Sequence, residues 1–242
     1  MALTAKKRLI VALDVADSAS ALKLVDLLKD EVGCFKVGLQ LFTAVGPKIV
    51  HDIVALGGRV FLDLKFHDIP NTVMEAGLSA VKTGAWMFNV HAAGGLKMMQ
   101  QTKEASLKLA AELGIEPPIV LAVTVLTSMN QAVLQNEVRV AYKVEEQVVH
   151  WAELAKKAGL DGVVASSQEV GALRRACGSD FLLVTPGIRP LWAAKNDQSR
   201  IMTPGDAVKA GSDYIVVGRP ITAASSPKEA AKKIVKEMEG KE

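Results

Sequence analysis

Asp63, Lys65 and Asp68 are three charged residues at the end of a segment that otherwise has the composition of a buried strand. Residues 59–62 before them are mostly apolar, and side chains alternate between the two faces of a strand. We therefore expect Asp63 and Lys65 to project from the same face. A lysine that neighbouring carboxylates keep protonated can stabilise developing negative charge and then donate a proton. The competing interpretation is a surface strand with an ordinary ion pair.

Polar or turn-forming residues also close the other apolar segments of the chain. They are Asp14, Lys36, Asn89 and His91, Thr127 and Ser128, Pro186, and Gly218 with Arg219. Each alone could be a solvated strand end, but together with Asp63, Lys65 and Asp68 they would bring two lysines and two or three aspartates to one site. Because buried charges persist only when they are paired, we expect these charges to alternate in sign.

Two further segments have features of a phosphate site. Gly218 and Arg219 form a turn that precedes a short helix, and an arginine offers two parallel donors to a phosphate. Residues 185–203 form a connection longer than most compact loops, which favours a lid from which Gln198 could reach the phosphate. The alternatives are a turn with an exposed arginine and a disordered insertion.

Short β-rich segments alternate with amphipathic helical ones, as in a parallel α/β fold. The predicted strands are 8–15, 34–39, 59–65, 86–91, 119–126, 162–166, 181–185 and 214–218. The predicted helices are 19–31, 73–83, 96–113, 145–158, 167–176, 203–210 and 227–238. Asn71 or Thr72 can cap the helix predicted over 73–83. Eight such units over residues 1–242 predict a single-domain (β/α)₈ TIM barrel with its site at the C-terminal strand ends. A doubly wound sheet is less favoured, because no glycine-rich turn follows the first strand.

Composition limits the class of protein. The 242 residues are 50% hydrophobic and carry a net charge of +3, which is enough apolar content for a large core and too little charge for a nucleic-acid or membrane surface. No apolar segment has membrane-spanning length, and Cys34 and Cys177 form no disulfide or zinc pattern, so we expect a soluble cytoplasmic protein without a metal site. We expect a structural role for His67, and His91 is a weak site candidate.

The motifs together resemble the orotidine 5'-phosphate decarboxylase family, in its bacterial type. The residues that carry this resemblance are Val11-Ala12-Leu13-Asp14, the run from Asp63-Leu64-Lys65 through Asp68-Ile69-Pro70-Asn71-Thr72, Thr185-Pro186-Gly187-Ile188-Arg189, and Val217-Gly218-Arg219-Pro220-Ile221. The resemblance covers nearly the whole chain in the right order.

The resemblance implies decarboxylation of orotidine 5'-monophosphate to uridine 5'-monophosphate without a metal or cofactor, by a homodimer whose sites lie at the interface. It implies the following roles: Lys65 as the proton donor to C6, beside Asp63 and Lys36; Asp68, Ile69 and Thr72 from the partner subunit; Asp14 and Lys36 at the ribose; Thr127 or Ser128 at the pyrimidine; Gln198, Gly218 and Arg219 at the phosphate; and Pro186 and Arg189 among the substrate contacts.

Two alternatives remain at this level. The pattern Asp63-x-Lys65-x-x-Asp68 is similar in sister enzymes, the 3-keto-L-gulonate 6-phosphate decarboxylases and hexulose-6-phosphate synthases, several of which use Mg²⁺. The extension 69–72 and the long loop favour the orotidylate branch. A catalytically silent phosphate-binding barrel is the other alternative.

Overall fold

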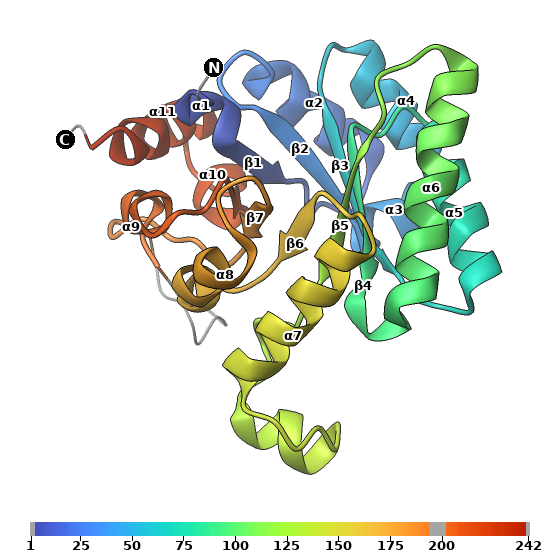
Figure 1. Cartoon of the computed structure of the whole chain (residues 1–242). Coiled ribbons are helices and arrows are strands. Elements are labelled where there is room, and N and C mark those ends of the chain that lie inside the picture. Colours follow the sequence, from blue (N-terminus) through green and yellow to red (C-terminus); the bar gives the residue numbers. More distant parts are fainter. Residues whose placement is uncertain (1–2, 194–201, 241–242) are drawn as a thin grey trace.

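Eight parallel strands close into a barrel in the computed structural model, which describes residues 3–193 and 202–240 (Figure 1). The strands follow one another in chain order, and the last pairs with the first. They are β1 (Leu9–Ala12), β2 (Cys34–Gly38), β3 (Val60–Phe66), β4 (Met87–His91), β5 (Ile119–Val123), β6 (Gly162–Val164), β7 (Leu182–Thr185) and β8 (Tyr214–Val217). The predicted (β/α)₈ barrel is therefore confirmed, and an open doubly wound sheet is excluded.

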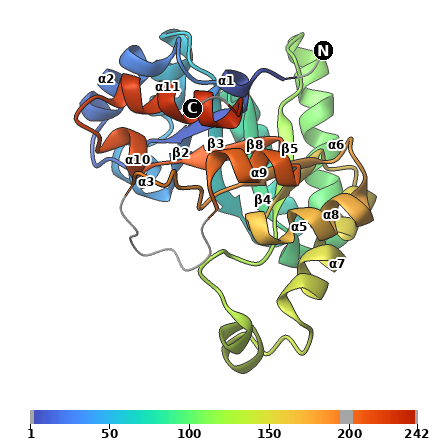
Figure 2. The same ribbon diagram turned by 90° about the vertical axis from the view of Figure 1, so that its left-hand side faces the viewer.

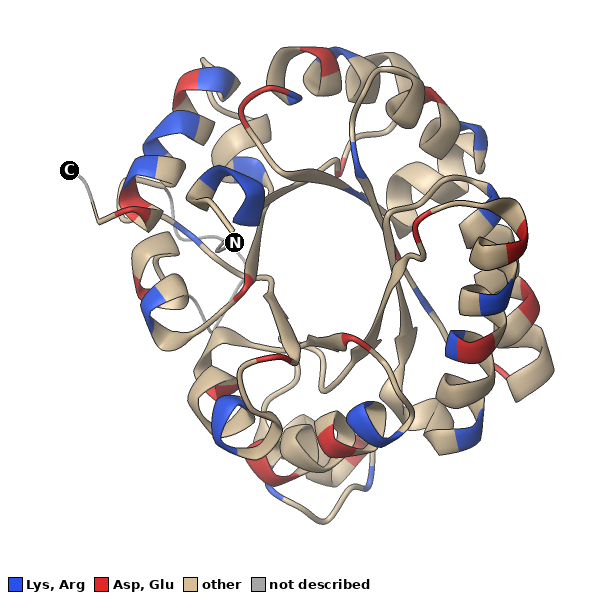
Figure 3. Ribbon diagram, turned by 45° about the horizontal axis from the view of Figure 1, so that its top comes forward, with Lys and Arg blue, Asp and Glu red and all other residues tan. Residues whose placement is uncertain are grey.

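Helices form a ring outside the barrel, and most of the charged residues lie on this ring (Figure 3). The helices are α1 (Ala5–Arg8), α2 (Ser18–Leu28), α3 (Leu39–Val45), α4 (Lys48–Ala55), α5 (Pro70–Lys82), α6 (Gly95–Leu113), α7 (Val144–Lys157), α8 (Val170–Cys177), α9 (Pro204–Ala210), α10 (Arg219–Thr222) and α11 (Pro227–Met238). None of the helices within the described ranges is long and apolar enough to cross a membrane.

Both faces of the strands are buried, in two separate layers. Along β1, Ile10 packs inside the barrel with Phe61, whereas Leu9 and Val11 pack outward against the helices. This arrangement explains why the strands are continuous apolar runs rather than alternating ones. The inner layer closes the barrel, so a ligand has access only to the ends of the strands.

The connection between β5 and α7 departs from the compact pattern. It extends away from the barrel, as both Figure 1 and Figure 2 show, and contains the π-helical turn Val133–Glu137. Val138 and Tyr142 in this connection are apolar side chains that remain exposed. The first residues of the connection, next to β5, remain at the end of the barrel.

Several predicted boundaries are wrong. The strands predicted over 8–15, 119–126 and 162–166 end earlier, because their last apolar residues leave the sheet but stay buried, as Val125 does. No helix was predicted over 39–55, where α3 and α4 form on either side of Gly46 and Pro47. Helix α5 begins at Pro70 and not after an Asn71 or Thr72 cap, since proline fits a first helical position whose N–H has no partner.

Candidate active site

The positions that face the barrel interior become polar toward the C-terminal ends of the first four strands. In each of these strands a polar residue stands two positions after a buried interior side chain. The pairs are Ala12 and Asp14, Cys34 and Lys36, Phe61 and Asp63, and Met87 and Asn89. Side chains two residues apart share a face, so these polar groups form a layer above the apolar interior. The predicted convergence of strand-end residues is therefore present for these four strands.

Four charged side chains in this layer alternate in sign. The Nζ atom of Lys36 lies 3.2 Å from Oδ1 of Asp14 and 3.5 Å from Oδ2 of Asp63. The Nζ atom of Lys65 donates to the other oxygen of Asp63, Oδ1, at 2.7 Å. The expected alternation is confirmed, and the side chains of Lys36 and Asp63 are only 12% and 13% exposed, which strengthens their attraction.

The carboxylate of Asp63 is held in its charged form. Burial by itself raises the pKa of Asp63, but the neighbouring ammonium groups of Lys36 and Lys65 outweigh burial, together with hydrogen bonds from Lys65 and Asn89. The net result is a pKa below the ordinary value of an aspartate. Asp63 therefore remains an anion that can keep an adjacent ammonium in place.

Lys65 has an unusual backbone conformation for a residue in a strand. Its φ angle is +53°, in the left-handed region that non-glycine residues rarely occupy. The pairing between β3 and β4 shifts here, because Leu62 pairs with Phe88 but Phe66 pairs with Val90. Simple alternation predicted that Asp63 and Lys65 meet, but it did not predict the bulge through which they do so.

One cavity lies directly beside Lys65. This lysine cavity has a volume of about 220 Å³ and is lined by Lys36, Asp63 and Lys65 and by apolar side chains such as Phe61 and Val164. Thr127 and Ser128 both line it, so both remain candidates for a polar contact. A partly apolar space with a few convergent polar groups is typical of a small-molecule site.

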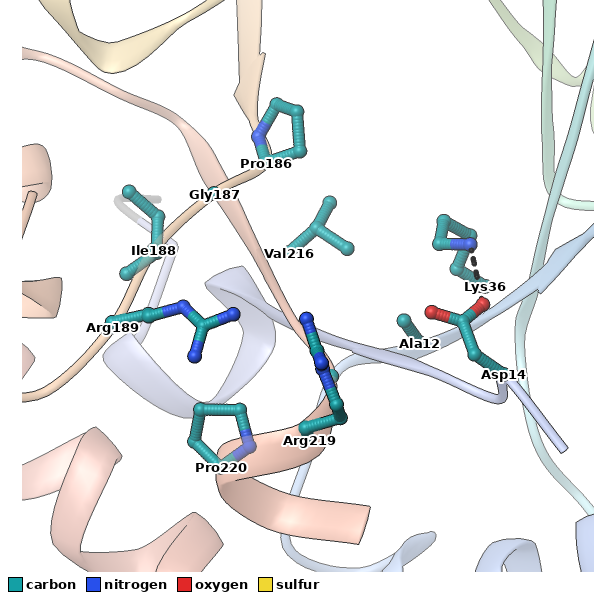
Figure 4. Close-up of a pocket in the computed structure, with 11 residues that line it drawn as sticks. Ala12, Asp14, Lys36, Pro186, Gly187, Ile188, Arg189, Val216, Arg219 and Pro220 are labelled. Atoms are coloured by element: carbon teal, nitrogen blue, oxygen red, sulfur yellow. Dashed lines mark hydrogen bonds and ion pairs between the residues drawn. The ribbon is translucent and has the colours of Figure 1, made fainter. Parts of the chain in front are cut away.

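A second cavity carries two arginines. This arginine cavity has a volume of about 150 Å³ and is lined by Arg189 and Arg219, with Gly218 beside them. Figure 4 shows the two guanidinium groups near each other, across the cavity from the ion pair of Asp14 with Lys36. Arg189 is only 7% exposed although it is charged, and it lines this cavity.

The two cavities are adjacent, because Lys36, Pro186 and Val216 line both of them. A molecule that occupied both would place one end at the two arginines and the other at Lys65. Paired arginines in a partly buried cavity suit an anion such as a phosphate. The geometry therefore fits an elongated anionic ligand.

Other predicted site residues do not line either cavity. Asp68, Ile69 and Thr72 are exposed at the start of α5, and Oδ1 of Asp68 accepts a hydrogen bond from the backbone N–H of Ile69 at 2.6 Å. Within this single chain, the structure does not bring them to Lys65. Gln198 lies outside the described residues.

The two histidines near the site contact each other. The rings of His67 and His91 stack with centroids 5.1 Å apart, and Nδ1 of His91 accepts a hydrogen bond from the N–H of Ala93. Burial and the nearby charges of His67 and Lys65 lower the pKa of His91 to about 4. His91 lines neither cavity, so its location supports a packing role over a catalytic one.

No group of His, Cys, Asp and Glu side chains within the described ranges is arranged to hold a metal ion. Cys34 and Cys177 are buried, unpaired thiols, and burial raises the pKa of both. Neither side chain belongs to the charged layer, so the candidate chemistry rests on lysine, aspartate and arginine.

The family model that matches this chain and its named relatives point to one family. The family model described as "Orotidine 5'-phosphate decarboxylase / HUMPS family" matches residues 7–234. The chain belongs to this family. A protein of Syntrophomonas wolfei named orotidine 5'-phosphate decarboxylase is 55% identical over 97% of this chain and 99% of its own length. A protein of the same name from Syntrophotalea carbinolica is 56% identical over 98% and 97%.

A solved structure supports the same assignment. The crystal structure of orotidine 5'-phosphate decarboxylase from Lactobacillus acidophilus is 41% identical, covers 95% of this chain and 97% of that one, and superposes with a TM-score of 0.84. These relatives favour the orotidylate branch of the family over the sister sugar-phosphate enzymes.

Proposed function

We propose that this chain decarboxylates orotidine 5'-monophosphate to uridine 5'-monophosphate and CO₂, the last step of pyrimidine nucleotide synthesis. The observation that carries the proposal is the position of the ion pair between Lys65 and Asp63, which lines the lysine cavity, while the adjacent arginine cavity offers a phosphate site. The names of the close relatives support the same substrate.

The reaction breaks the bond between C6 of the pyrimidine and its carboxylate. CO₂ leaves, and the electron pair of that bond stays on C6, where no adjacent carbonyl can delocalise it. A fixed ammonium aimed at C6 stabilises this charge without solvent reorganisation. Lys65 then gives one proton from Nζ to C6, which yields uridylate, and water returns the proton to the neutral amine.

Asp63 has two roles in this scheme. It keeps the ammonium of Lys65 in position through the 2.7 Å hydrogen bond, and its negative charge attracts that ammonium. Its second oxygen faces Lys36, so the carboxylate cannot turn away without losing an ion pair. Because Lys65 supplies both the cation and the proton, the proposed reaction needs neither a metal ion nor an organic cofactor.

The remaining contacts position the nucleotide. Arg189, Arg219 and Gly218 bind the phosphate, together with Gln198, and Asp14 and Lys36 bind the ribose hydroxyls. Thr127 or Ser128 contacts the pyrimidine, and Pro186, which lines both cavities, lies among the substrate contacts. Binding energy from the phosphate, far from the reacting carbon, can then be used to hold C6 against Lys65.

The active enzyme in this proposal is a cytoplasmic homodimer. Asp68, Ile69 and Thr72 are exposed on α5, and Ile69 is 66% exposed although it is apolar. Burial of this segment against a second copy would place Asp68 beside the partner subunit's lysine cavity. Each site would then contain a second carboxylate near the departing carboxylate of the substrate.

The direct test is incubation of the purified chain with orotidine 5'-monophosphate in the presence of EDTA. The proposal predicts loss of orotidylate absorbance and stoichiometric formation of uridylate, with rates unchanged by the chelator. Turnover that disappears with EDTA and returns with Mg²⁺ contradicts the metal-free mechanism. Binding of the nucleotide without any uridylate supports a silent binding protein and overturns the proposal.

A further inference from the structure

Asn89 is a buried polar residue that contacts both members of the Asp63–Lys65 pair. It lies in β4, is 0% exposed, and lines neither cavity. Its Oδ1 accepts a hydrogen bond from the backbone N–H of Lys65 at 2.8 Å, and its Nδ2 donates to Oδ1 of Asp63 at 2.7 Å. The orientation of the amide follows from these partners, because an N–H requires an acceptor and a carboxylate requires a donor.

The first of these hydrogen bonds lies where the regular pairing of the sheet is interrupted. Where the pairing of β3 with β4 shifts, Lys65 adopts its φ angle of +53°. The N–H of Lys65 donates to the side chain of Asn89 at this place. A side-chain acceptor at this place therefore stabilises a backbone conformation that lysine otherwise avoids.

The second hydrogen bond fixes the acid. Oδ1 of Asp63 accepts from both Nδ2 of Asn89 and Nζ of Lys65, each at 2.7 Å. Asn89 thus determines where the carboxylate lies, and the carboxylate determines where the ammonium lies. One side chain orients the backbone of the lysine and, through Asp63, its charged end.

We infer that Asn89 is a positioning residue for the decarboxylation, holding Lys65 in the left-handed conformation and Asp63 in the rotamer that aims the ammonium into the lysine cavity. This inference rests on the proposed roles of Lys65 and Asp63. Since Asn89 touches neither cavity, its loss should change the chemical step and leave nucleotide binding largely intact. An error of 1 Å in such a position can lower a rate by about 10²-fold.

The first variant is Asn89→Leu, which has a similar shape and removes both hydrogen bonds. We expect kcat to fall by about 10²-fold and both KM and the affinity for uridylate to change by less than about threefold. Thr124→Val is the matched control, because Thr124 is also buried at a neighbouring strand end but donates to the backbone carbonyl of Val164. It should retain the kcat of the unmodified enzyme.

The second variant, Asn89→Asp, keeps an acceptor for Lys65 but opposes Asp63 with a second carboxyl group. The charged groups facing position 89 are Asp63 and Lys65 on β3, with Lys36 beyond Asp63 on β2. The titratable group on its own strand is His91, and the partner position on β5 is Leu121. A proton shared by the two carboxyls restores the donor. The ratio of the variant's kcat to that of the unmodified enzyme should therefore increase as the pH falls. A purely structural role gives no such change in the pH profile.

The outcomes separate this inference from the proposed function. Low kcat with normal uridylate affinity in Asn89→Leu, together with the acid-shifted profile of Asn89→Asp, supports the positioning role. Normal kcat in Asn89→Leu, or a pH profile of Asn89→Asp parallel to that of the unmodified enzyme, overturns it even if Lys65→Ala is inactive. Should Asn89→Leu fail to fold, the profile of Asn89→Asp alone decides. Full activity of Lys65→Ala would instead remove the proposed function on which the inference depends.

Discussion

Lys36 and Asp63 face each other across the gap between β2 and β3, with Nζ of the lysine 3.5 Å from Oδ2 of the aspartate. Both side chains are largely buried, and Asp63 uses its other oxygen for Lys65 and Asn89. The carboxylate is therefore surrounded by donors on both sides. Its charge is a condition for the position of both lysines.

Asp63 should contribute stability that depends on pH. Its pKa is lower in the folded chain than in the unfolded one, where the pKa of an aspartate is about 3.9. The contribution is present above that value and is lost as the pH falls through the folded pKa. In urea unfolding between pH 6 and 3, the unmodified chain should lose stability more steeply below about pH 4 than Asp63→Asn. Asp26→Asn, at an exposed ion pair with Lys29, is the control. Parallel curves for the chain and Asp63→Asn would refute this prediction.

His91 should make the chain less stable in mild acid. Its folded pKa of about 4 lies below the value near 6.5 that a histidine has when unfolded. The unfolded state therefore binds the proton first, so stability is complete above about pH 6.5 and falls as the pH drops toward 4. NMR titration should show a neutral His91 imidazole down to about pH 5. A midpoint above pH 6 would contradict the burial of this ring against His67.

The barrel and the charged layer could be predicted from the sequence because each depends on local pattern. Apolar runs alternate with amphipathic segments, and polar residues such as Lys36 and Asp63 stand two positions beyond buried ones. The left-handed backbone of Lys65 depends instead on Asn89, which is 24 residues away. The polar strand ends included Asn89, but nothing in its spacing indicated which groups it would bind.

The exposed segment of α5 shows a different limit of prediction. The role of Asp68 in the partner subunit's site follows from the family resemblance and not from local pattern. In the single chain Asp68 is exposed. The helices over 39–55 were missed for a third reason, since Gly46 and Pro47 divide them into short pieces with little periodicity. Long-range contacts, partner contacts and short helices are the three features that local pattern does not determine.

Arg219 should act on the phosphate and on nothing else. Arg219→Ala should lower kcat/KM for orotidine 5'-monophosphate by at least about 30-fold, the loss expected for a charge-assisted contact. Orotidine, which has no phosphate, provides the matched control. Its slow decarboxylation should be the same in the variant and the unmodified enzyme. An equal loss with both substrates would show that Arg219 acts on folding or on the chemical step.

The dimer with shared sites can be tested by mixing two inactive variants. If Asp68 completes the partner subunit's site, a hybrid of Lys65→Ala with Asp68→Ala has one site with both defects and one intact site. Unfolding and refolding an equal mixture should then restore about one quarter of the unmodified activity, since about half of the dimers are hybrids. Each variant treated alone is the control. No recovery, with hybrid dimers verified by mass spectrometry, would place each site within one chain.

The most direct measurement of the central role is the turnover number of Lys65→Ala under saturating orotidine 5'-monophosphate. Lys48→Ala, which removes an exposed lysine from an ion pair with Asp52 on α4, is the matched control and should be fully active. Removal of the principal electrostatic group and proton donor should lower kcat by at least about 10³-fold, with uridylate still bound. A kcat within about tenfold of the unmodified enzyme would show that another group protonates C6.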